Sequence, residues 1–330
     1  MKLASARRGR DGELLVVSRD LTRAVRAGRI APTMQRALED WDRAHPALAL
    51  LYDALNAGTA AGAVALDHVT LDAPLPRAWQ WLDGSVFPQH GLLMAKAFNR
   101  TPQDIGMPLM YQGMSHRFLG PRDAVPFVSE DDNVDFEGEF AVVTGSVPMA
   151  ADRAVAAAAV RLVIQVNDWS LRRYAALEVK TGFGWLLAKP ACSAAPIAIT
   201  PDELGPLWRD QRVLAELEVL RGEEVFGRVP GEEMGCGFDE LIVHAARTRE
   251  LCAGTIIGSG TVSSSRYAEV GSCCISERQA IEMIRHGQPK TPYLKSGERV
   301  RMRAFAFDRS VPLFGTLDNT VIRQGNAAQD

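Results

Sequence analysis

The clearest structural signal in the chain comes from residues 135–145, which read DFEGEFAVVTG. The apolar run predicts a β-strand, and Glu137 and Glu139, two residues apart, would lie on the same face of it. Like charges on one face repel each other, and the pair costs stability unless a cation or protons neutralise it. A bound divalent metal would remove this repulsion. The alternative is that the face looks at water, where paired acids are ordinary.

A second apolar stretch also ends in a carboxylate. Residues 162–170 read LVIQVNDWS, and Asp168 follows the predicted strand directly. Strand ends in buried sheets commonly present catalytic groups, so Asp168 is a candidate partner for the two glutamates. The alternative is a turn cap, because Asn167-Asp168 followed by Ser170 is also typical turn chemistry.

Residues 71–330 consist mainly of short apolar runs separated by Gly and Pro, which is typical of a β-rich domain. Periodicity predicts strands over 136–144, 162–167, 213–220, 224–228 and 300–307. Helices are predicted over 152–159, 238–249 and 277–286, the last of them ending at Gly287 in a left-handed cap. The expected fold class is α+β with strands dominating.

Residues 1–70 are more basic and more helical, and they predict a small appended domain. Residues 2–7 and 13–18 flank Gly9-Arg10-Asp11-Gly12 and predict a hairpin, which we expect to sit largely in solvent because it is rich in arginine. Thr33 can cap one helix, whose apolar positions are Leu38, Trp41, Leu48 and Leu51. Nothing catalytic clusters here, so the region is interpreted as scaffold.

Composition narrows the class of protein. A chain of 330 residues with 47% hydrophobic content can bury a full core. Its 37 Lys and Arg against 40 Asp and Glu leave a net charge of -3, which argues against nucleic acid as a partner. The five cysteines show no CxxC spacing, and no apolar run is long enough for a membrane span or a signal peptide. These features predict a soluble cytoplasmic protein with reduced thiols.

Several of these segments together resemble the fumarylacetoacetate hydrolase family. The resemblance rests on Glu137-Gly-Glu139, residues 166–172 (VNDWSLR), Lys189, and residues 258–262 (GSGTV) followed by Gly271-Ser272, across about residues 75–320. It implies the family's β-rich roll for residues 71–330, a homodimer, and a Mg²⁺, Mn²⁺ or Ca²⁺ ion bound by Glu137, Glu139 and Asp168. Ligation by oxygen atoms alone also favours these hard cations over zinc.

The same resemblance suggests a fourth ligand and a general base. Members that cleave fumarylacetoacetate carry a metal-binding Asp seven residues before a catalytic His, and Asp83 and His90 have that offset. Alternatively, Asp83 caps a loop and His90 is structural. A Glu orients the His in the family, but counting from Gly271-Ser272 places Ile275 at that position. The nearest acids are Glu269 and Glu277, so the orienting group is left unassigned.

Lys189 matches the family lysine that polarises the substrate carbonyl, although a surface lysine is the alternative. Tyr111 and Thr261 resemble substrate contacts of the family, and Arg172 resembles a structural ion-pair partner. Ala175 stands where the fumarylacetoacetate enzymes have a substrate-binding Gln. The substrate therefore need not be fumarylacetoacetate.

The function expected from this resemblance is metal-dependent hydrolysis of a carbon-carbon bond in a β-diketo acid of fumarylacetoacetate or acylpyruvate type, as in aromatic and tyrosine degradation. The cation would chelate the small keto acid, His90 would activate water, and the leaving carbanion would be held as an enolate beside Lys189. The absent Glu and Gln favour an alternative: a decarboxylase, isomerase or dehydratase of a 2-oxo acid on the same metal platform. A metal-stabilised protein without turnover is the non-enzymatic alternative.

Overall fold

In the computed structural model, which describes residues 1–97, 99, 101 and 106–325, the acidic segment leads into the middle of the largest sheet. Strand β9 (Gly138–Thr144) pairs antiparallel with β10 (Val160–Asn167), and every residue of β9 is buried. The strands predicted over 136–144 and 162–167 are therefore present. Each ends where predicted, and its first residue is shifted by two positions. Burial on both faces explains the unbroken apolar run in β9.

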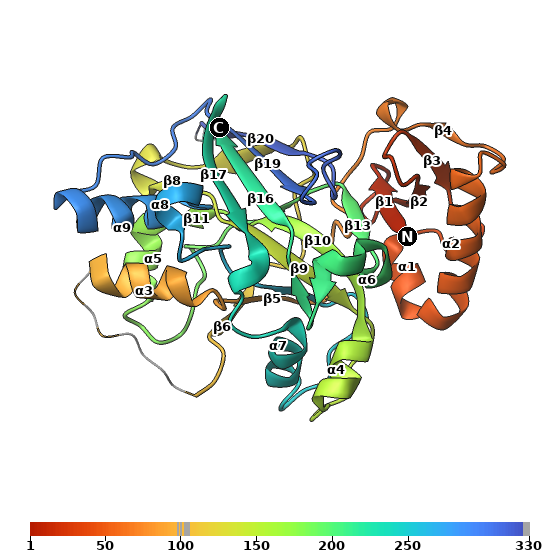
Figure 1. The fold of residues 1–330 in the computed structure, drawn as a ribbon, viewed down its shortest axis with the longest axis horizontal. Coiled ribbons are helices and arrows are strands. Elements are labelled where there is room, and N and C mark those ends of the chain that lie inside the picture. The colour runs from red at the N-terminus through yellow and green to blue at the C-terminus, as the bar shows by residue number, and fades with distance from the viewer. Residues whose placement is uncertain (98, 100, 102–105, 326–330) are drawn as a thin grey trace, which may run out of the picture.

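The large sheet has eleven strands, in the order β4-β3-β2-β1-β13-β10-β9-β18-β5-β6, with β12 paired to β10 (Figure 1). Most neighbours are antiparallel, whereas β18 and β5 are parallel. The remaining strands of this sheet are β1 (Lys2–Ala6), β2 (Glu13–Val17), β3 (Arg23–Arg26), β4 (Val64–Ala65), β5 (Trp81–Gly84), β6 (Met110–Gly113), β12 (Ser193–Ala194), β13 (Ile197–Ile199) and β18 (Ile256–Gly258).

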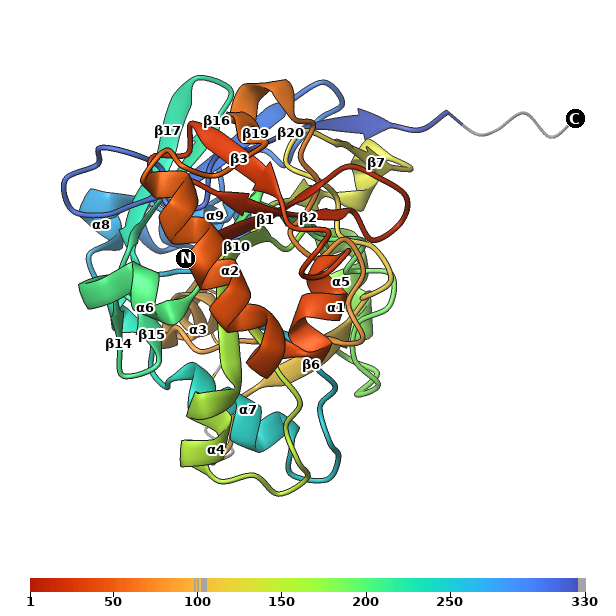
Figure 2. The same ribbon diagram turned by 90° about the vertical axis from the view of Figure 1, so that its right-hand side faces the viewer.

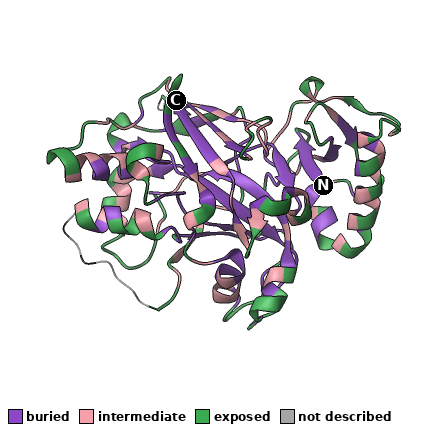
Figure 3. Ribbon diagram, viewed as in Figure 1, coloured by how far each residue is buried: buried purple, intermediate pink, exposed green. Residues whose placement is uncertain are grey.

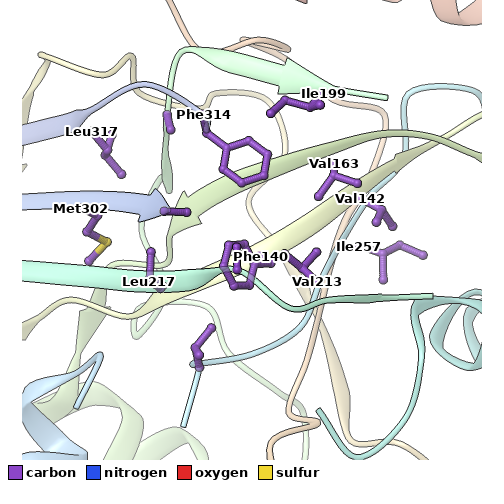
Figure 4. Close-up of a cluster of buried hydrophobic side chains, with 14 of the residues drawn as sticks. Phe140, Val142, Val163, Ile199, Val213, Leu217, Ile257, Met302, Phe314 and Leu317 are labelled. Atoms are coloured by element: carbon purple, nitrogen blue, oxygen red, sulfur yellow. The ribbon is translucent and has the colours of Figure 1, made fainter. Parts of the chain in front are cut away.

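A second sheet of five strands packs against the large one. Its order is β17 (Glu224–Pro230), β16 (Glu216–Arg221), β19 (Arg299–Phe305), β20 (Leu317–Arg323) and β7 (Ala124–Phe127). Apolar side chains from both sheets meet between them, with Phe140 and Val163 on one side and Leu217 and Met302 on the other (Figure 4). This layer is the main hydrophobic core.

Two two-stranded sheets complete the fold: β8 (Val134–Asp135) pairs with β11 (Ser170–Leu171), which is distant in the chain, and β14 (Trp208–Arg209) forms a hairpin with β15 (Arg212–Val213). The prediction of a single strand over 213–220 is wrong, because this range contains parts of two separate strands. Val213 pairs with Trp208 in the β14–β15 hairpin, and a separate strand, β16, begins at Glu216 and pairs with β17 and β19.

The helices lie outside the sheets, and most of those described have buried residues on one side (Figure 3). The helix predicted over 238–249 ends earlier, at Ala245, and the one predicted from Glu277 starts at Ile275 and does end at Gly287, whose φ is 79°. The helices are α1 (Met34–Glu39), α2 (Trp41–Asn56), α3 (Pro88–Ala97), α4 (Arg153–Ala159), α5 (Arg172–Glu178), α6 (Pro201–Leu204), α7 (Phe238–Ala245), α8 (Tyr267–Val270) and α9 (Ile275–His286). The 3₁₀ turns are η1 (Leu66–His68), η2 (Glu130–Asp132), η3 (Gly205–Leu207) and η4 (Gly231–Glu233).

The N-terminal segment differs from expectation in two ways. The β1–β2 hairpin forms, but β1 is fully buried and pairs with β13, so it extends the large sheet instead of facing solvent. The exposed arginines, Arg8 and Arg10, lie in the turn beyond the strands. Thr33 caps a helix as predicted, but the helix breaks at Asp40 into α1 and α2.

Helices α1 and α2 cover one end of the large sheet (Figure 2) and contribute Met34, Leu38 and Leu48 to a second core. That core takes the opposite side chains of the central strands, including Ala141 and Val143 of β9. In the part of the chain that the structure describes, no helix is both long and apolar enough to cross a membrane.

Candidate active site

Three carboxylates meet at the ends of neighbouring strands. Asp83 lies in β5, Glu139 in β9, and Asp168 follows β10 directly, and one oxygen from each lies within 4.8 Å of the others. Glu139 and Asp168 share the strand face of Ala141 and Val166, because alternate residues point the same way. All three side chains are buried.

A glycine in the intervening strand makes this meeting possible. Gly258 of β18 pairs with Asp83 on one side and Ala141 on the other. A Cβ atom at Gly258 would lie 2.3 Å from Oδ1 of Asp83 and 2.4 Å from the Trp81 ring. The carboxylates can therefore gather only because this position has no side chain.

The charges of two of these carboxylates are poorly compensated by the protein. Among the residues that the structure describes, neither carboxylate oxygen of Glu139 has a hydrogen-bond partner. Burial, together with the charges of Asp83 and Asp168, raises the pKa of Glu139 well above its usual value. Burial and the charge of Asp168 do the same to the pKa of Asp83, which accepts one hydrogen bond, from the backbone N–H of Gly260 (3.1 Å).

Three buried carboxylates, with both oxygens of Glu139 unpartnered among the described residues, are a donor set that suits a divalent cation. An ion would supply the missing positive charge, and three carboxylates with no sulfur or imidazole suit Mg²⁺, Mn²⁺ or Ca²⁺. The residues present therefore fit the group that the sequence predicts. Of the four predicted ligands, Glu137 is the one that is not part of this group of three.

Glu137 instead forms ion pairs with two basic side chains, Arg172 and Lys189. One of its oxygens accepts from Nη2 of Arg172 (2.5 Å) and the other from Nζ of Lys189 (2.8 Å). Burial would raise the pKa of Glu137, but Lys189 and Arg172 outweigh it and the pKa lies well below its usual value. Glu137 as a metal ligand stays a prediction, and it would require the Lys189 contact to move.

Lys189 is held among acceptors rather than at the surface. Its Nζ donates to Asp168 Oδ2 (2.6 Å), Glu137 Oε2 (2.8 Å) and Ser170 Oγ (2.8 Å), and its side chain is 9% exposed. Burial alone would lower the pKa of Lys189, but Asp168 and Glu137 raise it above its usual value. The ammonium is therefore charged at neutral pH.

His90 has the orienting glutamate that counting along the sequence did not find. His90 lies in α3, and its Nδ1 is 2.8 Å from Oε2 of Glu277, in the first turn of α9. Glu277 is fully buried, and its other oxygen accepts from Ser272 Oγ (3.1 Å). The count that placed this group at Ile275 was two residues short. The signal available in the sequence was that Glu277 is an acid at the start of the helix predicted over 277–286.

Of the His90–Glu277 pair and the three clustered carboxylates, His90 and Asp83 line one cavity of about 510 Å³. Tyr111 and Thr261 line it, as do Asp83, His90 and Lys189, so the structure brings the predicted substrate contacts to the same place. The Tyr111 hydroxyl donates to Asp168 Oδ2 (2.5 Å), and burial and Asp168 raise the pKa of Tyr111. Sequence reasoning missed two further buried groups here: Cys192, whose Sγ lies 3.0 Å from Asp168 Oδ1, and Asp135, which binds Arg172.

Comparison with known proteins agrees with this arrangement. The family model described as "Fumarylacetoacetase N-terminal domain 2" matches residues 1–77, and "Fumarylacetoacetate (FAA) hydrolase C-terminal" matches residues 80–322. A search of curated proteins gives no match.

Solved structures share the fold over nearly the whole chain. Maleylpyruvate hydrolase from Sphingobium sp. SYK-6 is 17% identical with a TM-score of 0.67, and a putative HpcE protein from Mycobacterium smegmatis is 18% identical with a TM-score of 0.69. A probable 2-hydroxyhepta-2,4-diene-1,7-dioate isomerase from Mycobacterium abscessus is 20% identical with a TM-score of 0.66. Each match covers 98% of this chain and 100% of the other. The Sphingobium enzyme has also been solved with manganese(II) and pyruvate.

Proposed function

Because the chain belongs to the fumarylacetoacetate hydrolase family, we propose that it is a metal-dependent hydrolase that cleaves a carbon-carbon bond in an acylpyruvate-type β-diketo acid. The observation that carries this proposal is the pairing of His90 with the buried Glu277, with His90 on the same cavity as Asp83 and Lys189. Hydrolysis needs a base that can take a proton from water, whereas isomerisation and decarboxylation of a keto acid need no hydroxide.

The pair supports a general-base role for His90. With Glu277 ionised, Nδ1 of His90 donates its proton to Oε2, which leaves the lone pair of Nε2 free to accept a proton. His90 would take a proton from water as the oxygen attacks the acyl carbonyl. It would return that proton to the carbon that departs when the carbon-carbon bond breaks, so that the products are a carboxylic acid and pyruvate.

Other residues would position the substrate and stabilise charge. A divalent ion held by Asp83, Glu139 and Asp168 supplies Lewis-acid polarisation of the keto-acid oxygens when it is bound. Lys189 would place its permanent positive charge beside the oxygen that becomes negative in the enolate. Tyr111 and Thr261 would contact the substrate from the wall of the cavity.

The remaining wall supports an uncharged acyl group. Leu109, Met110, Ala175, Val179 and Trp185 also line the cavity. The cationic side chains of Arg172 and Lys189 are already engaged with Asp135, Glu137 and Asp168. A second carboxylate on the substrate would lose hydration here without gaining an unengaged Arg or Lys among the described residues that line the cavity.

A second candidate is a decarboxylase or isomerase on the same carboxylate platform. The specific observation in its favour is Ala175, which lines the cavity where the fumarylacetoacetate enzymes carry a Gln, so one polar contact to a diketo substrate is missing. One fold neighbour is described as an isomerase, which is consistent with this option. A homodimer, a cytoplasmic location and the choice among Mg²⁺, Mn²⁺ and Ca²⁺ remain predictions from the family resemblance.

The test is a substrate panel with purified protein and either Mg²⁺ or Mn²⁺. Acylpyruvates with alkyl tails, the same acylpyruvates with a terminal carboxylate, fumarylacetoacetate and oxaloacetate are incubated and the products weighed by mass spectrometry. We expect two acids from alkyl acylpyruvates. Carbon dioxide from oxaloacetate together with intact acylpyruvates would reject the hydrolase in favour of the second candidate.

A further inference from the structure

A buried aspartate that the reaction scheme does not use connects the two halves of the site. Asp135 is fully buried and lies in β8, two residues before Glu137. Its carboxylate accepts three hydrogen bonds: from Arg172 Nε (2.8 Å), from the backbone N–H of Ile275 (2.7 Å) and from that of Ser276 (2.9 Å). A buried carboxylate is tolerated when its oxygens are satisfied in this way.

One set of these contacts leads to the carboxylate cluster. Arg172 uses Nε for Asp135 and Nη2 for Glu137, so Asp135 fixes the plane of the guanidinium that holds Glu137. Glu137 in turn contacts Lys189, which reaches Asp168. We call this the arginine arm.

The other set leads to the base. Ile275 and Ser276 are the first residues of α9, and their N–H groups have no partner within the helix. The negative charge of Asp135 at this helix end is favourable and holds the first turn in place. The next residue is Glu277, whose carboxylate orients His90. We call this the helix arm.

We propose that Asp135 is a positioning residue that sets the carboxylate cluster and the His90–Glu277 pair in register with each other. An Asn at this position would keep the size but offer only one acceptor oxygen, and its NH₂ would face a donor. The proposal deepens the proposed hydrolytic function and rests on it for the effect on turnover, whereas the positioning itself can be measured without a substrate.

The experiment compares Asp135→Asn with two variants that each disturb one end of the site. Arg172→Gln interrupts the arginine arm, and Ser272→Ala acts at the far end of the helix arm, where it removes a hydroxyl that contacts Glu277. Three quantities are measured on the full chain: the Kd for Mg²⁺ by calorimetry, the ring ¹⁵N signals of His90 by NMR, and kcat and KM on an alkyl acylpyruvate. Far-UV circular dichroism establishes that each variant is folded.

We expect Asp135→Asn to change both the Mg²⁺ affinity and the His90 signals and to lower kcat by about 10–100-fold, as is typical for partners one step behind a ligand, with KM changed less. Arg172→Gln should move the Mg²⁺ affinity alone, and Ser272→Ala the His90 signals alone. The proposal would be overturned by an Asp135→Asn protein that is less stable but otherwise unchanged. It would also be overturned if only the Mg²⁺ affinity or only the His90 signals changed.

A measurement on the natural chain decides the question if Asp135→Asn does not fold. Titration with Mg²⁺ should shift the His90 ring signals in the natural protein, and Arg172→Gln should abolish that shift; equal shifts in both would overturn the link. If no diketo acid is cleaved, the proposed function fails, but the Mg²⁺ and NMR results still decide the role of Asp135.

Discussion

Replacement of Glu277 by Gln is the sharpest perturbation of the proposed base. Glu277 is fully buried and lies 2.8 Å from Nδ1 of His90, so the change removes a charge-assisted hydrogen bond without changing the volume of the side chain. Such a bond contributes about 1.5–3 kcal/mol. If all of it is lost in the transition state, the rate falls by about 10–150-fold, at about 1.4 kcal/mol per tenfold.

The tautomer of His90 adds to this effect. A carboxamide can turn its NH₂ toward Nδ1, and the ring proton then moves to Nε2, the nitrogen that must accept a proton from water. We therefore expect kcat to fall by about 10²–10³-fold, below the limit of about 10⁴-fold for complete loss of a base. Binding of Mg²⁺ should stay near that of the natural protein, because Glu277 is not among the three clustered carboxylates.

The assay follows the loss of an alkyl acylpyruvate and the formation of pyruvate, with Mg²⁺ affinity measured in parallel. Glu269→Gln is the matched control, because Glu269 is the other acid near the expected position and is exposed. A Glu277→Gln enzyme within about threefold of the natural rate, or a control that loses as much activity, would refute the reasoning.

Four further outcomes are expected. His90→Ala should lower turnover by about two to four orders of magnitude with Mg²⁺ binding almost unchanged in calorimetry, whereas unchanged activity on oxaloacetate would contradict a hydrolytic base. Glu139→Gln should weaken Mg²⁺ binding by more than the roughly 10–100-fold typical of an outer partner, and unchanged affinity would argue against the site. A carboxyl group whose pKa is raised on folding contributes stability at pH values below its unfolded pKa of about 4, and this contribution is lost as the pH rises through the folded pKa. Because the pKa values of Asp83 and Glu139 are raised, the metal-free protein should become less stable with rising pH, and the Tm gain on adding Mg²⁺ should grow. A Tm gain that does not depend on pH would contradict this. Gly258→Ala should displace Asp83, because the added Cβ would lie 2.3 Å from its Oδ1, and calorimetry should then show weaker Mg²⁺ binding in a protein that still folds.

Local periodicity was sufficient for most of the strands. The apolar run after Glu139 and the run before Asp168 both form strands. Side chains on both faces of these strands are buried, so a continuous apolar run predicts them without knowledge of the neighbouring strands. The limits appear where pairing partners decide. Val213 leaves the strand predicted over 213–220 because Trp208 pairs with it, and nothing local signals that partner.

The N-terminal hairpin shows the same limit. Its two strands follow from the Gly-rich turn, but their burial depends on β13, almost two hundred residues away, through pairs such as Lys2 with Ile199. The arginine content of the whole segment suggested that the hairpin is exposed to solvent. Such a count does not distinguish residues in the turn from residues in the strands. The division at residue 70 stays a prediction.

The sequence by itself determined the family, the β-rich fold, and the residue types from which a metal site and a base could be built. Glu137, Glu139 and Asp168 could be chosen in advance from local motifs, and Asp83 from its offset of seven residues to His90. Only the tertiary structure decided which groups face each other: Glu277 with His90, Lys189 with Glu137, and Asp135 with both Arg172 and α9. Hydrogen bonds act over about 3 Å, so their partners are set by the packing of elements distant in the chain rather than by spacing along it.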